Sequence, residues 1–180
     1  MQRLLRIADL IDRFQDRFGK WLYWLVLGMV VIGGYNTIVR YVDRSIGMSL
    51  SSNMYLELQW YLFSLVFLLG AAYALRHDEH VRVDILYSRL SPKGRAWINV
   101  LGTLLFLVPF CGMMLWVSWP AVMNSWAVLE VSPDPGGLPR YPLKTAIPVA
   151  FILILIQGFS MFIRNLAVIR GFETAEEEPA

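Results

Sequence analysis

Apolar residues in this sequence are grouped into four long stretches that contain no Asp, Glu, Lys or Arg. These stretches cover residues 21–39, 58–75, 96–129 and 145–163. The first, second and fourth contain 19, 18 and 19 residues. At 1.5 Å per residue, a helix of this length extends roughly 28 Å, close to the hydrocarbon thickness of a bilayer of about 30 Å. Each of these three stretches therefore predicts one transmembrane helix.

The third stretch is longer, with 34 residues, and is interrupted by prolines. It predicts one crossing over 96–117, kinked near Pro109, and then an interfacial segment that contains Pro120. Tryptophans of this later half are expected at the level of the lipid headgroups: Trp116, Trp119 and Trp126. Ser91 followed by Pro92 is typical of a helix start, with the serine as N-cap.

Two shorter segments have apolar residues on one helical face only. Over 3–18 the apolar face consists of Leu4, Ile7, Ala8, Ile11, Phe14 and Phe18, and charged residues that include Asp9, Asp12 and Asp16 occupy the other face. This pattern predicts an amphipathic helix on the membrane surface that leads into the first span, or alternatively a helix packed on a partner protein. A second in-plane segment is predicted over 81–90.

The composition agrees with a membrane protein of one domain, 1–180. Hydrophobic residues make up 57% of the chain and charged residues 17%, whereas soluble domains contain about 25% charged residues. The first apolar stretch is too long for a typical signal-peptide core and has no small-x-small cleavage site after it. We therefore expect an all-α membrane protein with four transmembrane helices and additional in-plane amphipathic helices.

The distribution of Lys and Arg predicts the orientation. The segment before the first span and the loop between the second and third spans each contain five, and the other two loops and the C-terminal segment contain two each. Because the ends and the second loop face the same side, twelve basic residues oppose four. The positive-inside rule then places both termini in the cytoplasm of a bacterial inner-membrane protein. The loop over 132–142, with four of the nine prolines, is predicted to be a stiff periplasmic connection, and 171–180 an acidic tail.

Candidate catalytic and metal-binding residues are few. His77, Asp78, Glu79 and His80 could bind a divalent ion, but residues so close together on one short segment rarely converge on one metal, so a solvated turn is favoured. The single cysteine, Cys111, excludes an intrachain disulfide. We found no nucleophile–base pair, no phosphate-binding loop and no basic face for nucleic acid. The sequence predicts no enzyme, no cofactor and no nucleic-acid partner.

Glu57 is the ionisable residue with the strongest functional signal. It begins the second span and shares a helical face with Tyr61 and Ser64. An ionisable group at this depth needs a partner. A structural ion pair, within the chain or with another subunit, is favoured over a direct role in transport or simple exposure at the interface.

The other polar residues of the spans are better explained by hydrogen bonds between helices than by substrate binding. No inverted repeat and no pair of broken half-length helices is evident, although ion-coupled transporters commonly contain them. The chain is therefore predicted to be a scaffold or accessory subunit. The polar residues are Asn36, Ser64, Asn99, Thr103 and Gln157.

The run ELQWYLFSLVFLLGAAYALRHDEHVRVD, from Glu57 to Asp84, resembles the small membrane subunit of tripartite ATP-independent periplasmic (TRAP) transporters. An acid begins the second span of that family, and a His-x-x-x-Asp element follows the span; here that element is His80 to Asp84. The loop with Glu130, Val131 and Ser132 followed by Leu138-Pro139 is also similar. The resemblance covers nearly the whole chain.

This resemblance implies a subunit that binds no substrate. The large membrane subunit of the family carries the substrate and sodium sites, and a soluble periplasmic protein captures the substrate, typically an organic acid. The small subunit would brace the large one and help to dock the binding protein. This hypothesis gives three groups of residues separate roles. A neighbouring helix or the large subunit contacts Glu57, Tyr61 and Ser64. The in-plane segment is held at the membrane surface by His80, Arg82 and Asp84, and the docking site is bordered by Glu130, Ser132 and the residues up to Pro142. The alternative is an independent four-span anchor or homo-oligomer of a redox or signalling complex.

Overall fold

The computed structural model of the chain describes residues 1–46, 52–78 and 90–172. Within these residues the fold is helical, and four helical segments are long and apolar enough to cross a membrane, which confirms the predicted all-α, four-span architecture. The elements are α1 (Gln2–Ile46), α2 (Asn53–Arg76), α4 (Pro92–Gly102), the π-helix η1 (Thr103–Leu107), α5 (Val108–Ala127) and α6 (Tyr141–Ile169).

Helix α6 is the central element of the bundle. It packs against α1, α2, α4 and α5, and it contains more buried residues than any other helix described. Several of these residues are small, which lets neighbouring helices approach closely. At Gly158, for example, an added Cβ atom would lie 2.8 Å from Leu107 Cδ2.

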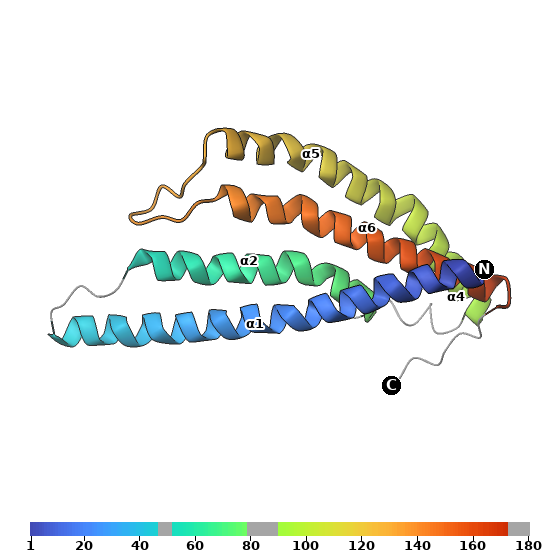
Figure 1. Cartoon of the computed structure of the whole chain (residues 1–180), viewed down its shortest axis with the longest axis horizontal. Helices are drawn as coiled ribbons and strands as arrows, with labels where there is room; N and C mark the ends of the chain where they lie inside the picture. Colours follow the sequence, from blue (N-terminus) through green and yellow to red (C-terminus); the bar gives the residue numbers. More distant parts are fainter. Residues whose placement is uncertain (47–51, 79–89, 173–180) are drawn as a thin grey trace.

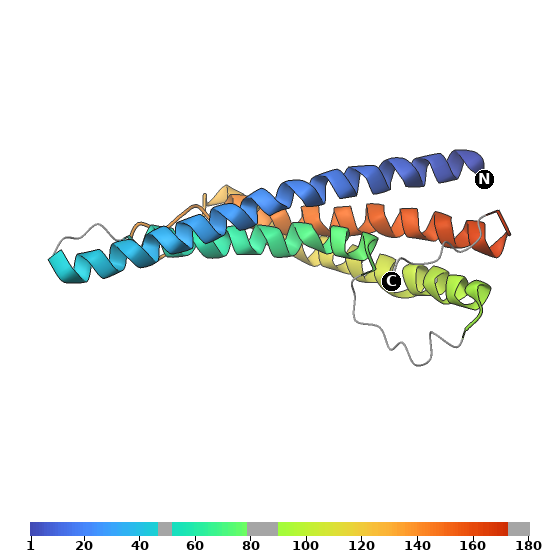
Figure 2. The same cartoon turned by 90° about the horizontal axis from the view of Figure 1, so that it is seen from below.

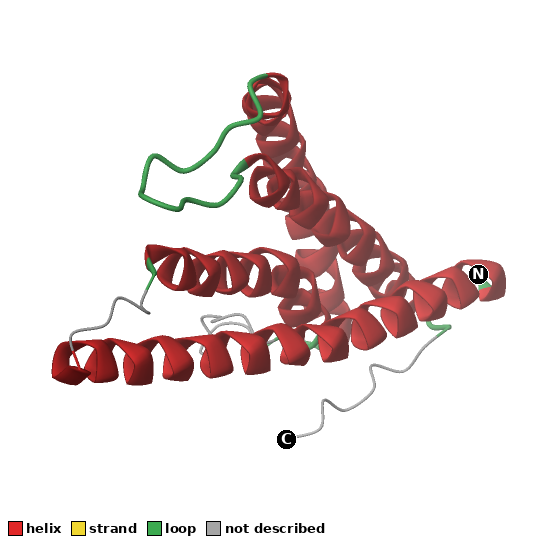
Figure 3. Ribbon diagram, turned by 60° about the vertical axis from the view of Figure 1, so that its left-hand side comes forward, coloured by secondary structure: helices red, strands yellow, loops and turns green. Residues whose placement is uncertain are grey.

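Helix α1 is one continuous helix of 45 residues. Its length of roughly 67 Å is about twice the thickness of the hydrocarbon core. The amphipathic segment predicted over 3–18 is helical, but it continues directly into the first span, and its N-terminal half crosses α6 (Figures 1 and 3). That this half lies in the plane of the membrane stays a prediction.

The expected outward orientation of the polar face of 3–18 was wrong for one residue. Asp12 is only 3% exposed and faces the bundle, together with Ala8 and Gln15, whereas Leu10 is 66% exposed. The reason is that α6 presents polar side chains at this level, so polar residues of α1 are buried by hydrogen bonding and not by hydrophobic packing.

The third span begins where the sequence predicted, with the Ser91 hydroxyl accepting a hydrogen bond from the Gly94 amide at 3.2 Å. The π-helical turn at Thr103–Leu107 lies directly before Pro109, near the predicted kink. Proline has no N–H to donate to the preceding turn, so a local irregularity is expected there. The helix nevertheless continues through Pro120 to Ala127, beyond the predicted end of the crossing at 117.

Different segments of the chain gather at the two ends of the bundle. The N-terminus, the C-terminal end of α2, the start of α4 and the C-terminal end of α6 lie toward one end (Figures 1 and 2). The loop between α5 and α6 and the far ends of α1 and α2 lie toward the other. Most of the predicted in-plane segment 81–90 and of the acidic tail 171–180 falls outside the described residues.

Candidate functional site

The loop between α5 and α6 begins with a tight helix end that determines the position of Glu130. Leu129 adopts a left-handed backbone conformation, with φ of 46°. The Glu130 amide donates to the Ser125 carbonyl at 3.0 Å, and the Leu129 amide donates to the Trp126 carbonyl at 3.3 Å. These two bonds form a Schellman motif, which satisfies the last carbonyl groups of α5 and reverses the chain.

The Glu130 carboxylate then joins α5 to α6. Its Oε2 atom accepts a hydrogen bond from the Ser125 hydroxyl at 2.6 Å and pairs with the Lys144 ammonium group. The bond from Lys144 and then the bond from Ser125 hold the pKa of Glu130 below its ordinary value. The predicted site residue Glu130 therefore has partners within the chain.

Glu57 attaches this loop to α2. The residue is 1% exposed, and its Oε2 atom accepts a hydrogen bond from the Leu138 amide at 2.6 Å. Tyr61, one turn later on α2, donates its hydroxyl to the Leu138 carbonyl at 3.2 Å. Both polar groups of one loop residue, Leu138, are thus bound by adjacent turns of α2, from the face that Glu57 and Tyr61 share.

Ser132 and Arg140 complete this end of the bundle. Ser132 is 7% exposed, its amide donates to the Leu138 carbonyl at 3.0 Å, and its hydroxyl accepts from Arg140 Nη2 at 3.3 Å. Ser64, which was grouped with Glu57 in the sequence, donates to the Trp60 carbonyl of its own helix at 2.8 Å and takes no part in this cluster.

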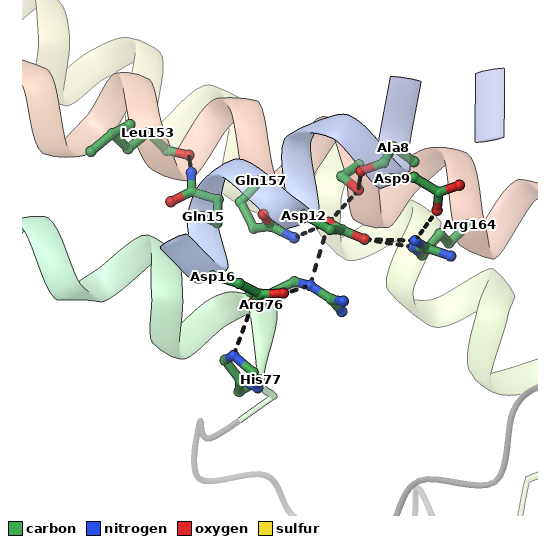
Figure 4. A network of polar contacts seen from close by, with 11 residues as sticks. Ala8, Asp9, Asp12, Gln15, Asp16, Arg76, His77, Leu153, Gln157 and Arg164 are labelled. Atoms are coloured by element: carbon green, nitrogen blue, oxygen red, sulfur yellow. Dashed lines mark hydrogen bonds and ion pairs between the residues drawn. The ribbon is translucent and has the colours of Figure 1, made fainter. Parts of the chain in front are cut away.

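At the opposite end, Asp12 is the centre of a second polar cluster (Figure 4). Its Oδ1 atom accepts hydrogen bonds from Gln157 Nε2 at 3.0 Å and from the Ser160 hydroxyl at 2.7 Å. Its Oδ2 atom accepts from Arg164 Nε at 2.8 Å. Because α1 supplies the carboxylate and α6 supplies the donors, this cluster bonds the N-terminal part of the chain to its last helix.

Neighbouring residues extend the Asp12 cluster to α2 (Figure 4). Arg164 Nη2 also pairs with Asp9 at 2.7 Å. Arg76, the last residue of α2, has its Nε atom 3.6 Å from Asp12 Oδ1, and His77 Nε2 lies 3.1 Å from Asp16 Oδ1. Helices α1, α2 and α6 therefore meet at one buried carboxylate.

Sequence reasoning did not find the Asp12 cluster, although a signal was present. Ala8, Asp12, Gln15 and Gly19 recur at helical spacing and form a small, polar stripe inside an otherwise amphipathic segment. A complementary stripe of Gln157, Ser160 and Arg164 lies on α6. The interhelical role predicted for Gln157 is confirmed, as is that of Asn99, whose amide donates to Asn165 on α6 at 3.1 Å.

Several predicted residues lie outside these clusters. Within the described residues, no group of three or more His, Cys, Asp or Glu could hold a metal ion. Asp78 is described, and His77 contacts Asp16. Glu79, His80, Arg82 and Asp84 lie outside the described residues. Thr103 donates to the Asn99 carbonyl of the preceding turn, so it makes no bond between helices there.

In the Asp12 cluster and in the cluster around Glu130, the charged groups are bound to neighbouring helices. The Asp12 oxygens are occupied by an amide, a hydroxyl and a guanidinium group, and the Glu130 carboxylate is paired with Lys144. Such bonds keep helices in register, and at the buried Asp12 the loss of its partners would leave a buried charge uncompensated.

Known proteins that are similar to this chain are subunits of membrane transporters. The model of the family described as "Tripartite ATP-independent periplasmic transporters, DctQ component" matches residues 29–168. A protein of Haemophilus influenzae assigned as a TRAP transporter small permease protein is 27% identical over 129 residues, which cover 70% of this chain and 73% of the relative. No solved structure matches the chain.

Proposed function

Because this chain belongs to the DctQ family of TRAP transporter small permease subunits, we propose that it braces the large transport subunit during sodium-coupled uptake of an organic acid. The chain is a multi-pass inner-membrane protein and a transporter subunit, not an enzyme. The large subunit would carry the substrate and sodium sites, and a soluble periplasmic protein would deliver the substrate.

The observation that carries this proposal is that both carboxylate oxygens of Asp12 accept hydrogen bonds from within the chain. An ion or substrate pathway needs polar groups that can release their partners and bind the ion or substrate. The Asp12 carboxylate instead accepts hydrogen bonds from three side chains of α6 and has Arg76 of α2 nearby. Such a cluster supports a rigid framework against which another subunit can move.

The loop from Glu130 to Pro142 is proposed to help dock the periplasmic binding protein. Its attachment through Glu57, Tyr61 and Lys144 supports this role, since a surface with a defined conformation binds with a smaller entropic cost. We further propose that both termini and the Asp12 cluster are cytoplasmic. On that side, His80, Arg82 and Asp84 would hold the segment 81–90 at the membrane surface. The exposed apolar residues of 3–18 would contact membrane lipid.

Copurification tests the proposal. The tagged chain is co-expressed with a large membrane subunit of a TRAP transporter from the same organism, extracted in mild detergent and purified in one step. We expect a stable complex of both subunits, and sodium-dependent uptake of the substrate that requires both. Recovery of a lone chain, or of a homo-oligomer that leaves the large protein behind, would contradict the proposal and favour the independent membrane anchor.

A further inference from the structure

The far half of α1 has a groove beside α2 that no part of the described chain fills. The groove has a volume of about 660 Å³ and is lined by residues of both helices, among them Gly33, Gly34, Asn36, Arg40 and Gln59. In this region α1 lies at the edge of the bundle, with α2 as its neighbour (Figures 1 and 3).

Asn36 indicates that the occupant of the groove has a hydrogen-bond donor. The residue is 4% exposed, and its Oδ1 atom has no hydrogen-bond partner among the described residues. An unsatisfied buried acceptor is costly, and more so where lipid replaces water. A lipid acyl chain cannot donate a hydrogen bond, whereas the side chains of transmembrane helices commonly do so across an interface.

Gly33 and Gly34 indicate that this occupant is a helix that approaches α1 closely. An added Cβ atom at Gly33 would lie 2.6 Å from Gln59 Nε2, so Gly33 is occupied by α2. At Gly34, in contrast, an added Cβ atom would have nothing within 4 Å. Its bare backbone is therefore open to a second helix, and small residues are the usual contact points of helices in membranes.

Two basic residues add charge at the end of the groove. Arg40 and Arg44 line a second hollow with Thr37 and Tyr41, one to two turns beyond Asn36. Neither arginine makes an ion pair within the part of the chain that the structure describes. An acidic side chain on the incoming helix would complement them.

We propose that this groove is the docking site for a transmembrane helix of the large transport subunit. That helix would present a small residue at Gly34, a hydrogen-bond donor to Asn36 Oδ1, and an acidic group near Arg40. The inference rests on the proposed function, because it assumes that a large subunit is present, and it names the face of this chain that the subunit covers.

The test compares leucine substitutions at three glycines that all have open space around them. Gly34→Leu fills the groove, whereas Gly102→Leu and Gly112→Leu place the same side chain on α4 and α5, outside the lining of the groove. Tagged variants are co-expressed with the large subunit and purified in mild detergent. We expect Gly34→Leu to reduce the copurified large subunit about tenfold, corresponding to about 1.4 kcal/mol, with both controls close to wild type.

Asn36→Leu separates binding from folding. If Oδ1 serves the partner, this variant copurifies less of the large subunit, while the chain purified alone melts at the same or a higher temperature, because a buried unsatisfied group has been removed. A lower melting temperature of the lone variant would assign Asn36 a role in folding and overturn the inference.

The remaining outcomes are also decisive. Failure of the wild-type chain to copurify any large subunit would contradict the proposed function itself. Normal complex formation by Gly34→Leu would overturn the groove as the docking site, even with the function intact. Loss of bound phospholipid from Gly34→Leu without loss of the complex, seen by native mass spectrometry, would assign the groove to lipid. A dimer of the lone wild-type chain that Gly34→Leu dissociates would assign it to a second copy.

Discussion

Asp12 near the start of the chain and Arg164 near its end form a hydrogen-bonded ion pair, with Arg164 Nε 2.8 Å and Nη2 2.7 Å from Asp12 Oδ2. The pair is separated by 152 residues, so it closes the bundle from α1 to α6. Asp12 is almost completely buried, whereas the side chain of Arg164 is 31% exposed. The carboxylate therefore depends on its partners more strongly than the guanidinium group does.

Removing the charge of Asp12 is expected to destabilise the fold. Asp12→Asn weakens the charge-assisted hydrogen bonds that the buried carboxylate accepts from α6, at an expected cost of about 1.5–3 kcal/mol. Asp9→Asn is the matched control, because Asp9 is 49% exposed and exposed pairs contribute below about 1 kcal/mol. Thermal unfolding of the detergent-purified chain measures both variants. Equal melting temperatures for the two variants would show that the burial of Asp12 is not important for stability.

Close packing between α1 and α2 is expected to be intolerant of a methyl group at Gly19. An added Cβ atom there would lie 2.0 Å from Tyr73 Cδ2, so it would clash with the tyrosine ring. Gly19→Ala therefore forces the ring or the helix to move, with an expected cost of about 1–3 kcal/mol. Gly112→Ala, in open space on α5, is expected to change stability little or to raise it by up to about 1 kcal/mol through helix propensity. Thermal unfolding distinguishes the two variants, and a stable Gly19→Ala would contradict this packing.

The hydrogen bond from the Leu138 amide to Glu57 is expected to slow exchange of the Leu138 amide hydrogen with solvent. Glu57→Ala removes a charge-assisted hydrogen bond, which is worth about 1.5–3 kcal/mol, so exchange of the Leu138 amide hydrogen should accelerate about tenfold or more. Glu57→Gln retains an acceptor and should have a smaller effect. Tyr61→Phe tests the bond to the Leu138 carbonyl in the same experiment. Unchanged exchange in Glu57→Ala would mean that the loop is held by other contacts.

Low pH is expected to weaken the contact of Glu130 with Lys144. Because the pKa of Glu130 is held below its ordinary value of 4.5, the folded protein binds fewer protons than the unfolded chain near that pH. The stabilisation is fully present above about pH 4.5 and is lost as the pH falls through the lowered pKa of the folded state. Melting temperatures between pH 3 and 7 measure this loss. In Glu130→Gln the corresponding part of the pH dependence should disappear, and its persistence would assign it to other carboxylates.

Reporter fusions test the orientation. Alkaline phosphatase, which is active only in the periplasm, is inserted at Gly136 in the loop or fused after Ala180. We expect activity from the first fusion and none from the second, because the basic residues that flank the spans are concentrated on the side of both termini. Green fluorescent protein after Ala180 should give the complementary result. The reverse pattern would place both termini in the periplasm and contradict the proposal.

The sequence by itself determined the number of spans and the start of the third helix. Stretches of 18 or more apolar residues have few alternatives to a membrane helix, and Ser91-Pro92 favours a helix start by local hydrogen bonding. It also indicated that Glu57 has a partner, because a carboxylate at that depth is costly when unpaired. These inferences depend on local chemistry, which neighbouring residues decide.

Only the tertiary structure decided which groups meet. Asp12 was predicted on an outer face because a polar residue in an amphipathic helix normally faces water or headgroups. It is buried because Gln157, Ser160 and Arg164 approach from a helix more than 140 residues away. Likewise, the partner of Glu57 is a backbone amide of Leu138, which no charge pattern predicts. Hydrogen bonds between distant helices depend on how the helices cross, and that geometry exists only in the assembled bundle.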